Sequence, residues 1–192
     1  MDRKDIDEWR KAFNNDQNTK LSFDAITKFI ENNRFGSTKE NILIKLCIIN
    51  QLYSTNIHYP VNLANHIFKY GTELDSLIKA WDVKAIDIFR DCEITTSWWK
   101  GKTMNFYSFA TKYCSFHNPE KYPKFDSLIE NHLKLKNNKT NLRDYKIYKQ
   151  VLEDYKKSIW CDDLSFDEFD KWLWYILRKE KKDKDTLDKA KS

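Results

Sequence analysis

The chain has 192 residues, a formal net charge of +5 and a pI near 8.8, with seven tryptophans but only three glycines and three prolines. This length forms one ordinary domain or two small units in close contact, and so few glycines and prolines leave few turns for a β-sheet protein. The moderate basic excess suits a polyanionic partner, but it also suits many enzymes that never bind nucleic acid.

Four cysteines lie far apart, at positions 47, 92, 114 and 161. Their spacing fits neither a zinc site nor an iron–sulfur cluster, so we expect reduced, mostly buried thiols and no metal. The start, MDRKDIDEWRK, has no apolar signal segment, and the apolar run ILIKLCII contains Lys45 and is too short to cross a bilayer. These features predict a soluble protein, cytoplasmic or nucleoid-associated.

Helical periodicity covers nearly the whole first half of the chain, and strict strand-like alternation is hard to find. Ser22 is predicted to cap a helix that carries an apolar stripe. Ser37 and Glu40 form a capping box before a helix over 41–53, whose apolar positions surround most of its axis, so we expect it to be central and buried. Pro60 is predicted to begin the next helix.

The second half continues the same pattern. Three helices are predicted over residues 73–81, 83–90 and 103–116. The segment HNPEKYPKF then breaks the pattern, and a short helix follows Asp126. A longer amphipathic helix comes next, and the capping box of Ser165 and Glu168 opens the last one. From Lys179 onward charges alternate with almost nothing apolar, which predicts a fraying helix end or a disordered tail.

Lys102 and Asp126 stand at two predicted helix starts, 24 positions apart (126 − 102 = 24). Taken singly, Lys102 is an exposed turn residue beside Gly101, and Asp126 is the N-cap of the helix SLIENHL. Taken together, a lysine and an aspartate at the starts of two helices can converge on one cleft. Both interpretations stay open on these residues alone.

Three segments resemble the helix-hairpin-helix DNA glycosylase superfamily, in the family's order. Residues 48–68, IINQLYSTNIHYPVNLANHIF, are similar to its buried helix, the polar turn that enters the DNA, and the next helix. Residues 101–105, GKTMN, resemble the segment in which a hairpin glycine leads into a catalytic lysine. Residues 122–127, YPKFDS, resemble the loop that carries the family's aspartate at a helix start.

The resemblance implies an all-α fold of two packed helical subdomains with a cleft between them. It implies a single glycosylase-like domain over residues 1–178, with one subdomain over 36–118, the other over 1–35 plus 119–178, and a charged tail over 179–192. It further implies a monomer without cofactor or metal, whose partner is double-stranded DNA that contains a damaged or modified base.

The resemblance assigns catalysis to Asp126 and Lys102. The N-glycosidic bond breaks through an oxocarbenium-like sugar, and a carboxylate at Asp126 stabilises that positive charge. A neutral Lys102 amine, favoured by burial and by cations such as Lys100 and Lys112, can attack C1′ and form a Schiff base that permits strand cleavage. If Lys102 is idle, Asp126 directs water in a simple glycosylase, and the sequence leaves both routes open.

The same resemblance implies two sets of contacts to DNA and a pocket for the flipped base. The polar turn fills the gap that the base leaves, unless it is only a solvated loop; its residues are Tyr53, Ser54, Thr55 and Asn56. Further contacts are assigned to Lys100, Gly101 and Lys112. The pocket candidates are Phe106, Tyr107, Phe116 and His117, although aromatic residues at helical spacing more often belong to a core. Phosphates at the mouth of the cleft are predicted to contact Lys100, Lys102, Lys112, Lys121 and Lys124.

The chain departs from the family pattern in three ways. The family's apolar-Pro-Gly-apolar-Gly hairpin, which holds a phosphate with amides and a bound cation, is reduced to Gly101 in TTSWWKGK. Lys100 and Lys102 are expected to replace part of that contact. The spacing from lysine to aspartate is a few residues long, and the iron–sulfur cysteines are absent, so the resemblance is to the cluster-free branch that includes the 8-oxoguanine enzymes.

Two other classes of function remain open. One is an all-helical module that binds nucleic acid or a protein without chemistry, with Lys102 in a turn and Asp126 as a cap. The other is a glycosylase that acts in defence by removing modified bases from foreign DNA.

Overall fold

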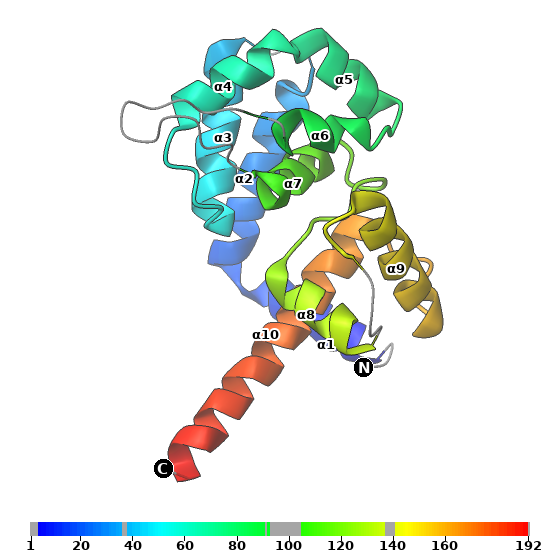
Figure 1. Cartoon of the computed structure of the whole chain (residues 1–192). Coiled ribbons are helices and arrows are strands. Elements are labelled where there is room, and N and C mark those ends of the chain that lie inside the picture. Colours follow the sequence, from blue (N-terminus) through cyan, green and yellow to red (C-terminus); the bar gives the residue numbers. More distant parts are fainter. Residues whose placement is uncertain (1–3, 36–37, 91, 93–104, 137–140, 192) are drawn as a thin grey trace. The chain divides into compact units, whose positions relative to one another are not determined.

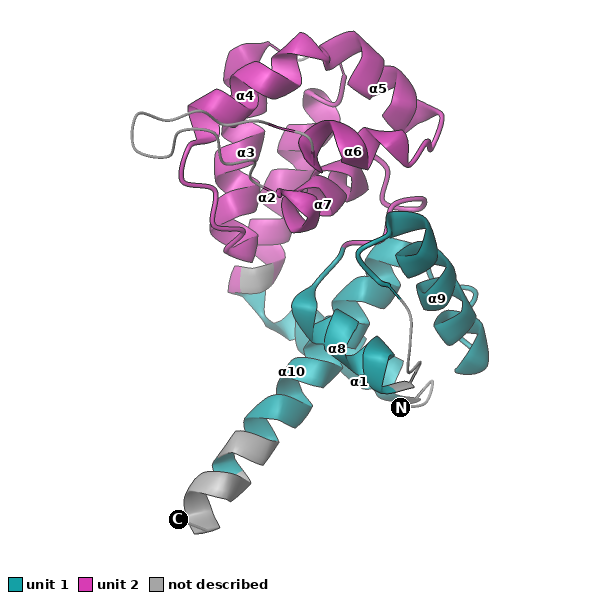
Figure 2. Cartoon of the chain, viewed as in Figure 1, with its two compact units in different colours: residues 1–17, 125–192 teal, residues 18–124 magenta. Residues whose placement is uncertain are grey.

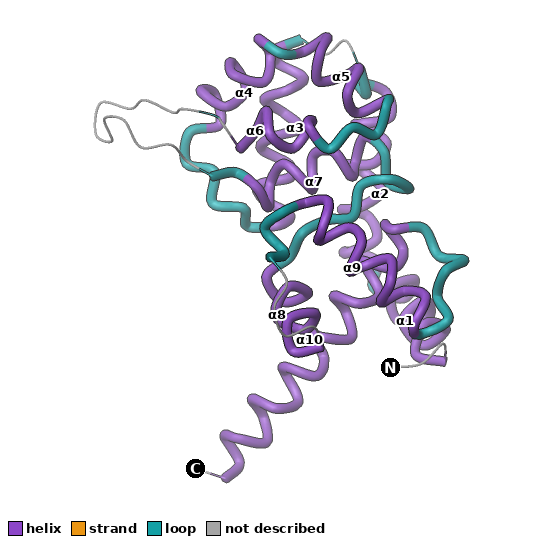
Figure 3. Tube along the Cα trace, turned by 45° about the vertical axis from the view of Figure 1, so that its right-hand side comes forward, coloured by secondary structure: helices purple, strands orange, loops and turns teal. Residues whose placement is uncertain are grey.

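The computed structural model describes residues 4–35, 38–90, 92, 105–136 and 141–191. All regular secondary structure in these ranges is helical, so the predicted all-α class is confirmed (Figures 1 and 3). The helices are α1 (Lys4–Asn15), α2 (Gln17–Asn32), α3 (Lys39–Tyr53), α4 (Pro60–Lys69), α5 (Gly71–Lys79), α6 (Lys84–Arg90), α7 (Tyr107–His117), α8 (Ser127–Lys136), α9 (Tyr145–Ser158) and α10 (Phe166–Lys191).

The chain forms two compact units (Figure 2). Unit 2 is the continuous segment Asn18–Lys124, and unit 1 combines Met1–Gln17 with Phe125–Ser192. Nearly all of α2 belongs to unit 2, and the subdomain boundary at residue 36 stays a prediction. No described helix is long and apolar enough to cross a bilayer.

Helix α3 is the first central helix of unit 2, and it packs against α4 and α7. Ile42, Leu46 and Ile49 are buried along it. Its N-cap is Thr38, whose hydroxyl accepts the Asn41 amide at 3.3 Å. The predicted cap residue, Ser37, lies outside the described residues, and the helix begins two residues before the predicted start.

The other central helix of unit 2 is α7, which is buried along most of its length. Phe109 and Tyr113 of α7 pack against Phe89 of α6, with ring centroids 5.8 and 5.1 Å apart. Pro60 stands at the first turn of α4, as predicted, because its fixed φ suits that position and its missing amide hydrogen has no helical partner there. The prediction that Ser22 caps a helix is wrong: it lies inside α2, where its hydroxyl donates to the Asn18 carbonyl at 2.9 Å.

Unit 1 is built from α1, α8, α9 and α10, with α10 in contact with both α1 and α8. The capping box that opens α10 is confirmed: the Glu168 amide donates to Ser165 Oγ at 3.2 Å, and the Ser165 amide donates to Glu168 Oε2 at 3.1 Å. The charged segment from Lys179 was predicted to be a fraying helix end or a disordered tail, and α10 continues through it as a helix to Lys191. Three of the four cysteines are buried and all four are free, as predicted; Cys47 is the exposed one.

Candidate nucleic-acid interface

The turn between α3 and α4 is held in place by one side chain, Asn50. Its Oδ1 accepts hydrogen bonds from Thr55 Oγ1 at 2.9 Å and from the Ile57 amide at 3.0 Å, and its Nδ2 donates to the Ile57 carbonyl at 3.2 Å. Ser54 and Asn56 have φ values of 48° and 56°, so the backbone reverses sharply while both side chains stay exposed. The predicted DNA-contacting turn is thus ordered before any partner binds.

Tyr53, Lys112 and Phe116, which were predicted to serve the DNA in different ways, lie together beside this turn. The Tyr53 and Phe116 rings meet edge to face, with centroids 6.0 Å apart. Lys112 Nζ lies 5.4 Å from the Tyr53 centroid and donates to Ser108 Oγ at 2.7 Å, and Lys124 Nζ lies 5.4 Å from the Phe116 centroid. Both lysines are almost fully buried. Their ammonium groups therefore interact with the two aromatic rings from inside the unit.

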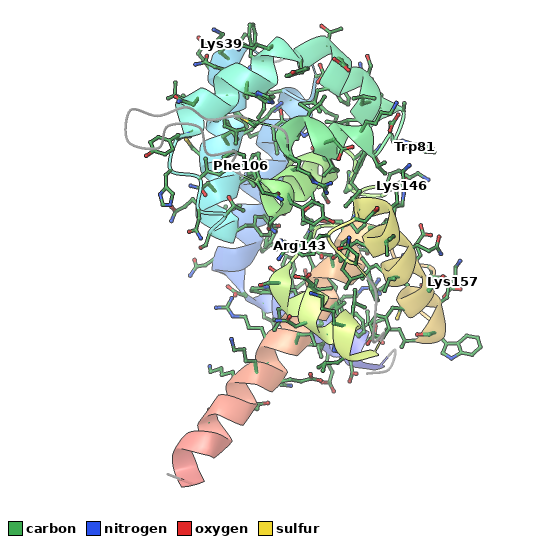
Figure 4. The ribbon with its side chains drawn as sticks, in the orientation of Figure 1. Lys39, Trp81, Phe106, Arg143, Lys146 and Lys157 are labelled. Atoms are coloured by element: carbon green, nitrogen blue, oxygen red, sulfur yellow. The ribbon has the colours of Figure 1, made fainter. Side chains whose placement is uncertain are left out.

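The other base-pocket candidates lie in the core of unit 2. Phe106, Tyr107 and His117 are each at most 5% exposed, and Phe106 lies inside the unit (Figure 4). The Arg90 guanidinium carbon lies 5.1 Å from the Tyr107 ring centroid. Phe116 is half-buried, so of the four candidates it is the one with appreciable exposed surface.

A buried polar cluster that the sequence did not reveal surrounds His117. Lys45 is fully buried, and its Nζ lies 3.1 Å from His117 Nε2 and 3.4 Å from the Arg34 carbonyl. Because His117 Nδ1 lies 2.8 Å from the Tyr113 carbonyl, Nδ1 carries the proton and Nε2 accepts from Lys45. Burial, opposed by the charge of Asp75, lowers the pKa of Lys45 to about 8.

Burial is also the largest influence on His117, followed by the nearby charge of Lys45, and together they lower its pKa to about 3. The imidazole therefore stays neutral near pH 7 and supports Lys45 as a hydrogen-bond acceptor. Next to this cluster is a pocket of about 240 Å³. It is lined by Ile42, Ile67, Phe68, Gly71, Thr72, Leu74, Asp75 and Tyr113.

Asp126 begins α8 in unit 1, and its Oδ1 accepts the Leu128 amide at 2.8 Å. The N-cap interpretation of this residue is therefore confirmed. Immediately beyond it, α8 and α10 line a groove of about 510 Å³. The groove residues are Ser127, Leu128, Asn131, Trp174, Arg178, Lys181 and Lys182.

Two of the three basic residues of this groove, Lys181 and Lys182, come from the segment after Lys179 that the sequence predicted to be a fraying helix end or a disordered tail. Arg178, Lys181 and Lys182 have the i, i+3, i+4 spacing that puts side chains on one face of a helix. The Arg178 guanidinium carbon lies 4.7 Å from the Trp174 ring centroid. Three cations and an aromatic ring in one groove form a surface that attracts an anion such as a phosphate.

Lys100, Gly101 and Lys102 lie outside the described residues, so their assigned contacts and the lysine nucleophile stay predictions. Asp126 and the turn residues are placed within unit 1 and unit 2 respectively. Among the described residues, no group of three or more His, Cys, Asp or Glu side chains could hold a metal ion.

These features define an all-helical protein with an ordered polar turn on one unit and a basic groove on the other. Residues 4–121 match the HI_0787_N family, which is described as an N-terminal domain, and the chain belongs to this family. The chain is also 36% identical over 150 residues to an uncharacterized protein of Haemophilus influenzae, a match that covers 73% of this chain and 68% of that protein. No solved structure matches.

Proposed function

We propose that this protein is a DNA glycosylase that flips a damaged or modified base out of the duplex and cleaves its N-glycosidic bond. The observation that carries the proposal is the position of Asp126, at a helix start and directly before a groove that contains Arg178, Lys181 and Lys182. A carboxylate beside cations that can hold phosphates suits base excision, because the charged sugar and its flanking phosphates bind together.

In this proposal the bond between C1′ and the base nitrogen breaks, and its electron pair leaves with the base, which then takes up a proton. The Asp126 carboxylate stabilises the positive charge left on the sugar. Its capping bond engages Oδ1, and a carboxylate has two oxygens with about four acceptor positions, so capping and catalysis are compatible. Water then adds to C1′; alternatively, the Lys102 amine adds and forms a Schiff base, which gives AP-lyase activity.

The ordered turn of unit 2 supports the same proposal from the side of DNA binding. A base that leaves the stack must be replaced, and a preformed polar turn can enter the gap without first losing conformational entropy. Thr55 and Ile57, on either side of Asn56, are held by the Asn50 network, and the ring of Tyr53 at the start of the turn packs against Phe116. The two-subdomain cleft implied by the glycosylase resemblance belongs to this proposal.

The second candidate is a helical module that binds nucleic acid or a protein without chemistry. The capping bond of Asp126 favours it, because that bond gives the residue a structural reason to be present. The polar turn and the basic groove serve this function equally well.

The deciding experiment incubates the protein with duplexes that carry a panel of damaged or modified bases, and then uses alkali to reveal abasic sites. Asp126→Asn is the matched variant, because asparagine caps a helix about as well as aspartate but carries no charge. We expect base release by the wild type and none by the variant, with DNA binding kept. Base release at the wild-type rate in Asp126→Asn would rule out the catalytic role, and no release by the wild type from any duplex would favour the binding module.

Borohydride trapping tests the covalent route separately. If Lys102 forms the Schiff base, reduction should link the wild type to the DNA and should fail to link Lys102→Gln. Base release without trapping would indicate a simple glycosylase that uses water.

A further inference from the structure

Two helices end with a tryptophan in a backbone conformation that normally belongs to glycine. After α5, the Trp81 amide donates to the Ile78 carbonyl at 3.3 Å and the Asp82 amide donates to the Leu77 carbonyl at 2.9 Å. This pair of hydrogen bonds is the Schellman motif, and Trp81 occupies its left-handed position with φ 62°. A bulky residue at positive φ is strained, which suggests that its side chain has a use.

The second case is Trp160 at the end of α9, with φ 59°. Its amide donates to the Lys157 carbonyl at 3.1 Å, and the Cys161 amide donates to the Lys156 carbonyl at 3.0 Å, so the motif is the same. Trp81 belongs to unit 2 and Trp160 to unit 1. Trp81 has Lys121 Nζ 4.1 Å from its ring centroid and is followed directly by Asp82, and Trp160 is followed by acidic residues at 162 and 163.

The surroundings of Trp81 fix the ring at the surface of unit 2. It lies at the edge of the unit, where α5 ends (Figure 4), and is 52% exposed. Lys121 Nζ lies 4.1 Å from its ring centroid. The adjacent Tyr122 is buried, and its hydroxyl donates to the Asp82 carbonyl at 2.9 Å, so the loop that carries Lys121 is attached to the turn that carries Trp81.

A rigid, half-exposed indole with an ammonium on its ring can contact both parts of a nucleotide. The indole offers a face or edge on which a base stacks, and stacking of this kind tolerates any sequence because every base has a π-face. The ammonium is within reach of the phosphate that follows the stacked base. A paired base inside a duplex is already stacked on both sides, so the nucleotide that fits is an unpaired one.

We infer that Trp81 and Lys121 form a stacking site for an unpaired nucleotide of single-stranded nucleic acid. This site is separate from the α3–α4 turn, because the turn and the end of α5 lie on opposite sides of unit 2 (Figures 1 and 3). The inference rests on the proposed function only for its choice of nucleic acid as partner, and it does not require base excision.

The test measures binding of a short fluorescein-labelled oligothymidine to the full chain by anisotropy. Trp81→Ala should weaken binding about tenfold, the loss expected when one stacked base loses its aromatic partner. Trp160→Ala is the matched control, since it removes an exposed tryptophan from the same backbone motif in unit 1, and it should leave binding unchanged. Lys121→Gln should weaken binding and make its salt dependence shallower.

Comparison with Trp81→Gly separates the side chain from the backbone. Glycine relieves the strain at positive φ, so the Tm of Trp81→Gly should exceed that of Trp81→Ala by about 4 °C, while both variants bind equally weakly. Recovery of binding in Trp81→Gly would show that backbone strain, not the ring, affects binding, and would overturn the inference. Equal losses in Trp81→Ala and Trp160→Ala, or no loss in Trp81→Ala, would overturn it as well.

The outcome is distinguishable from failure of the proposed function. Base release from saturating duplex, measured in a single turnover, should be the same in Trp81→Ala and wild type, because the stacking site does not contact the excised base. Loss of oligothymidine binding with no excision activity in the wild type would support the stacking site and reject the glycosylase. Normal oligothymidine binding by Trp81→Ala, with excision intact, would reject the stacking site alone.

Discussion

Replacing Asn50 with alanine should release the α3–α4 turn while leaving the helices in place. The change removes both acceptor bonds of Oδ1 and the donor bond of Nδ2, which together connect Asn50 to Thr55 and Ile57. Alanine favours the helix, so α3 itself should not be weakened by the new residue. What is lost is the attachment of the turn.

The magnitude follows from the bonds. A hydrogen bond within a protein contributes about 1 kcal/mol net, so three of them give a loss of about 3 kcal/mol in the free energy of unfolding. DNA binding should fall as well, because the released residues must then be ordered on the DNA at about 1 to 2 kcal/mol each. Ordering one such residue weakens affinity about tenfold.

Urea unfolding followed by circular dichroism gives the first quantity, and fluorescence anisotropy with a duplex gives the second. Thr55→Val is the matched control, since it removes one of the three bonds and should cost about 1 kcal/mol. Unchanged stability in Asn50→Ala would show that Asn50 does not hold the turn. A stability loss with unchanged DNA affinity would show that the turn does not contact DNA.

Three other predictions concern charge. Affinity for duplex DNA should fall steeply between about 50 and 200 mM salt. Replacing Lys181 and Lys182 with alanine should reduce the slope of log K against log salt by about 2. An unchanged slope would show that the groove does not contact the DNA phosphates. Because the folded state lowers the pKa of Lys45 to about 8, the unfolded chain binds more protons at Lys45 between pH 8 and 10.5, and the free energy of unfolding should rise with pH in that range. From pH 7 to 9.5 this rise should be about 2 kcal/mol smaller in Lys45→Met than in the wild type. Parallel curves of stability against pH for the two proteins would contradict the lowered pKa. Asp126→Asn should change the free energy of unfolding by less than about 0.5 kcal/mol, and a larger loss would mean that its charge stabilises the fold.

Most helices could be predicted from the sequence, because their signals are local. Periodicity located the helical segments, and the Ser165–Glu168 capping box marked the start of α10 to the residue. The cap predicted at Ser22 was wrong because a serine inside a helix can donate its hydroxyl to the carbonyl four residues earlier, as Ser22 does to Asn18. A serine before an apolar stripe therefore does not by itself mark a helix start. The state of the chain beyond Lys179 was left open between a helix end and a disordered tail, because charged residues sustain a helix only when their spacing and propensity permit it.

The candidate site was less accessible to prediction, since its important contacts join distant parts of the chain. The pairing of Lys45 with His117 spans 72 positions, and nothing near either residue signals the other. Tyr113 was one of many aromatic residues at helical spacing, and only the fold shows that it lines a pocket. Asn50 could have been found: an amide that follows the apolar run of this helix, just before a polar turn, suggests a side chain that organises that turn.

The division of the chain into units has a consequence for the order of events during synthesis. Unit 2 is continuous in sequence, so all of its core contacts become available once residue 124 has left the ribosome. Unit 1 must wait, because α1 has to remain without its partner until α10 is made. The α1 surface that carries Ile6 and Trp9 is therefore the apolar surface exposed longest in a nascent chain, and it is where we expect a chaperone to bind.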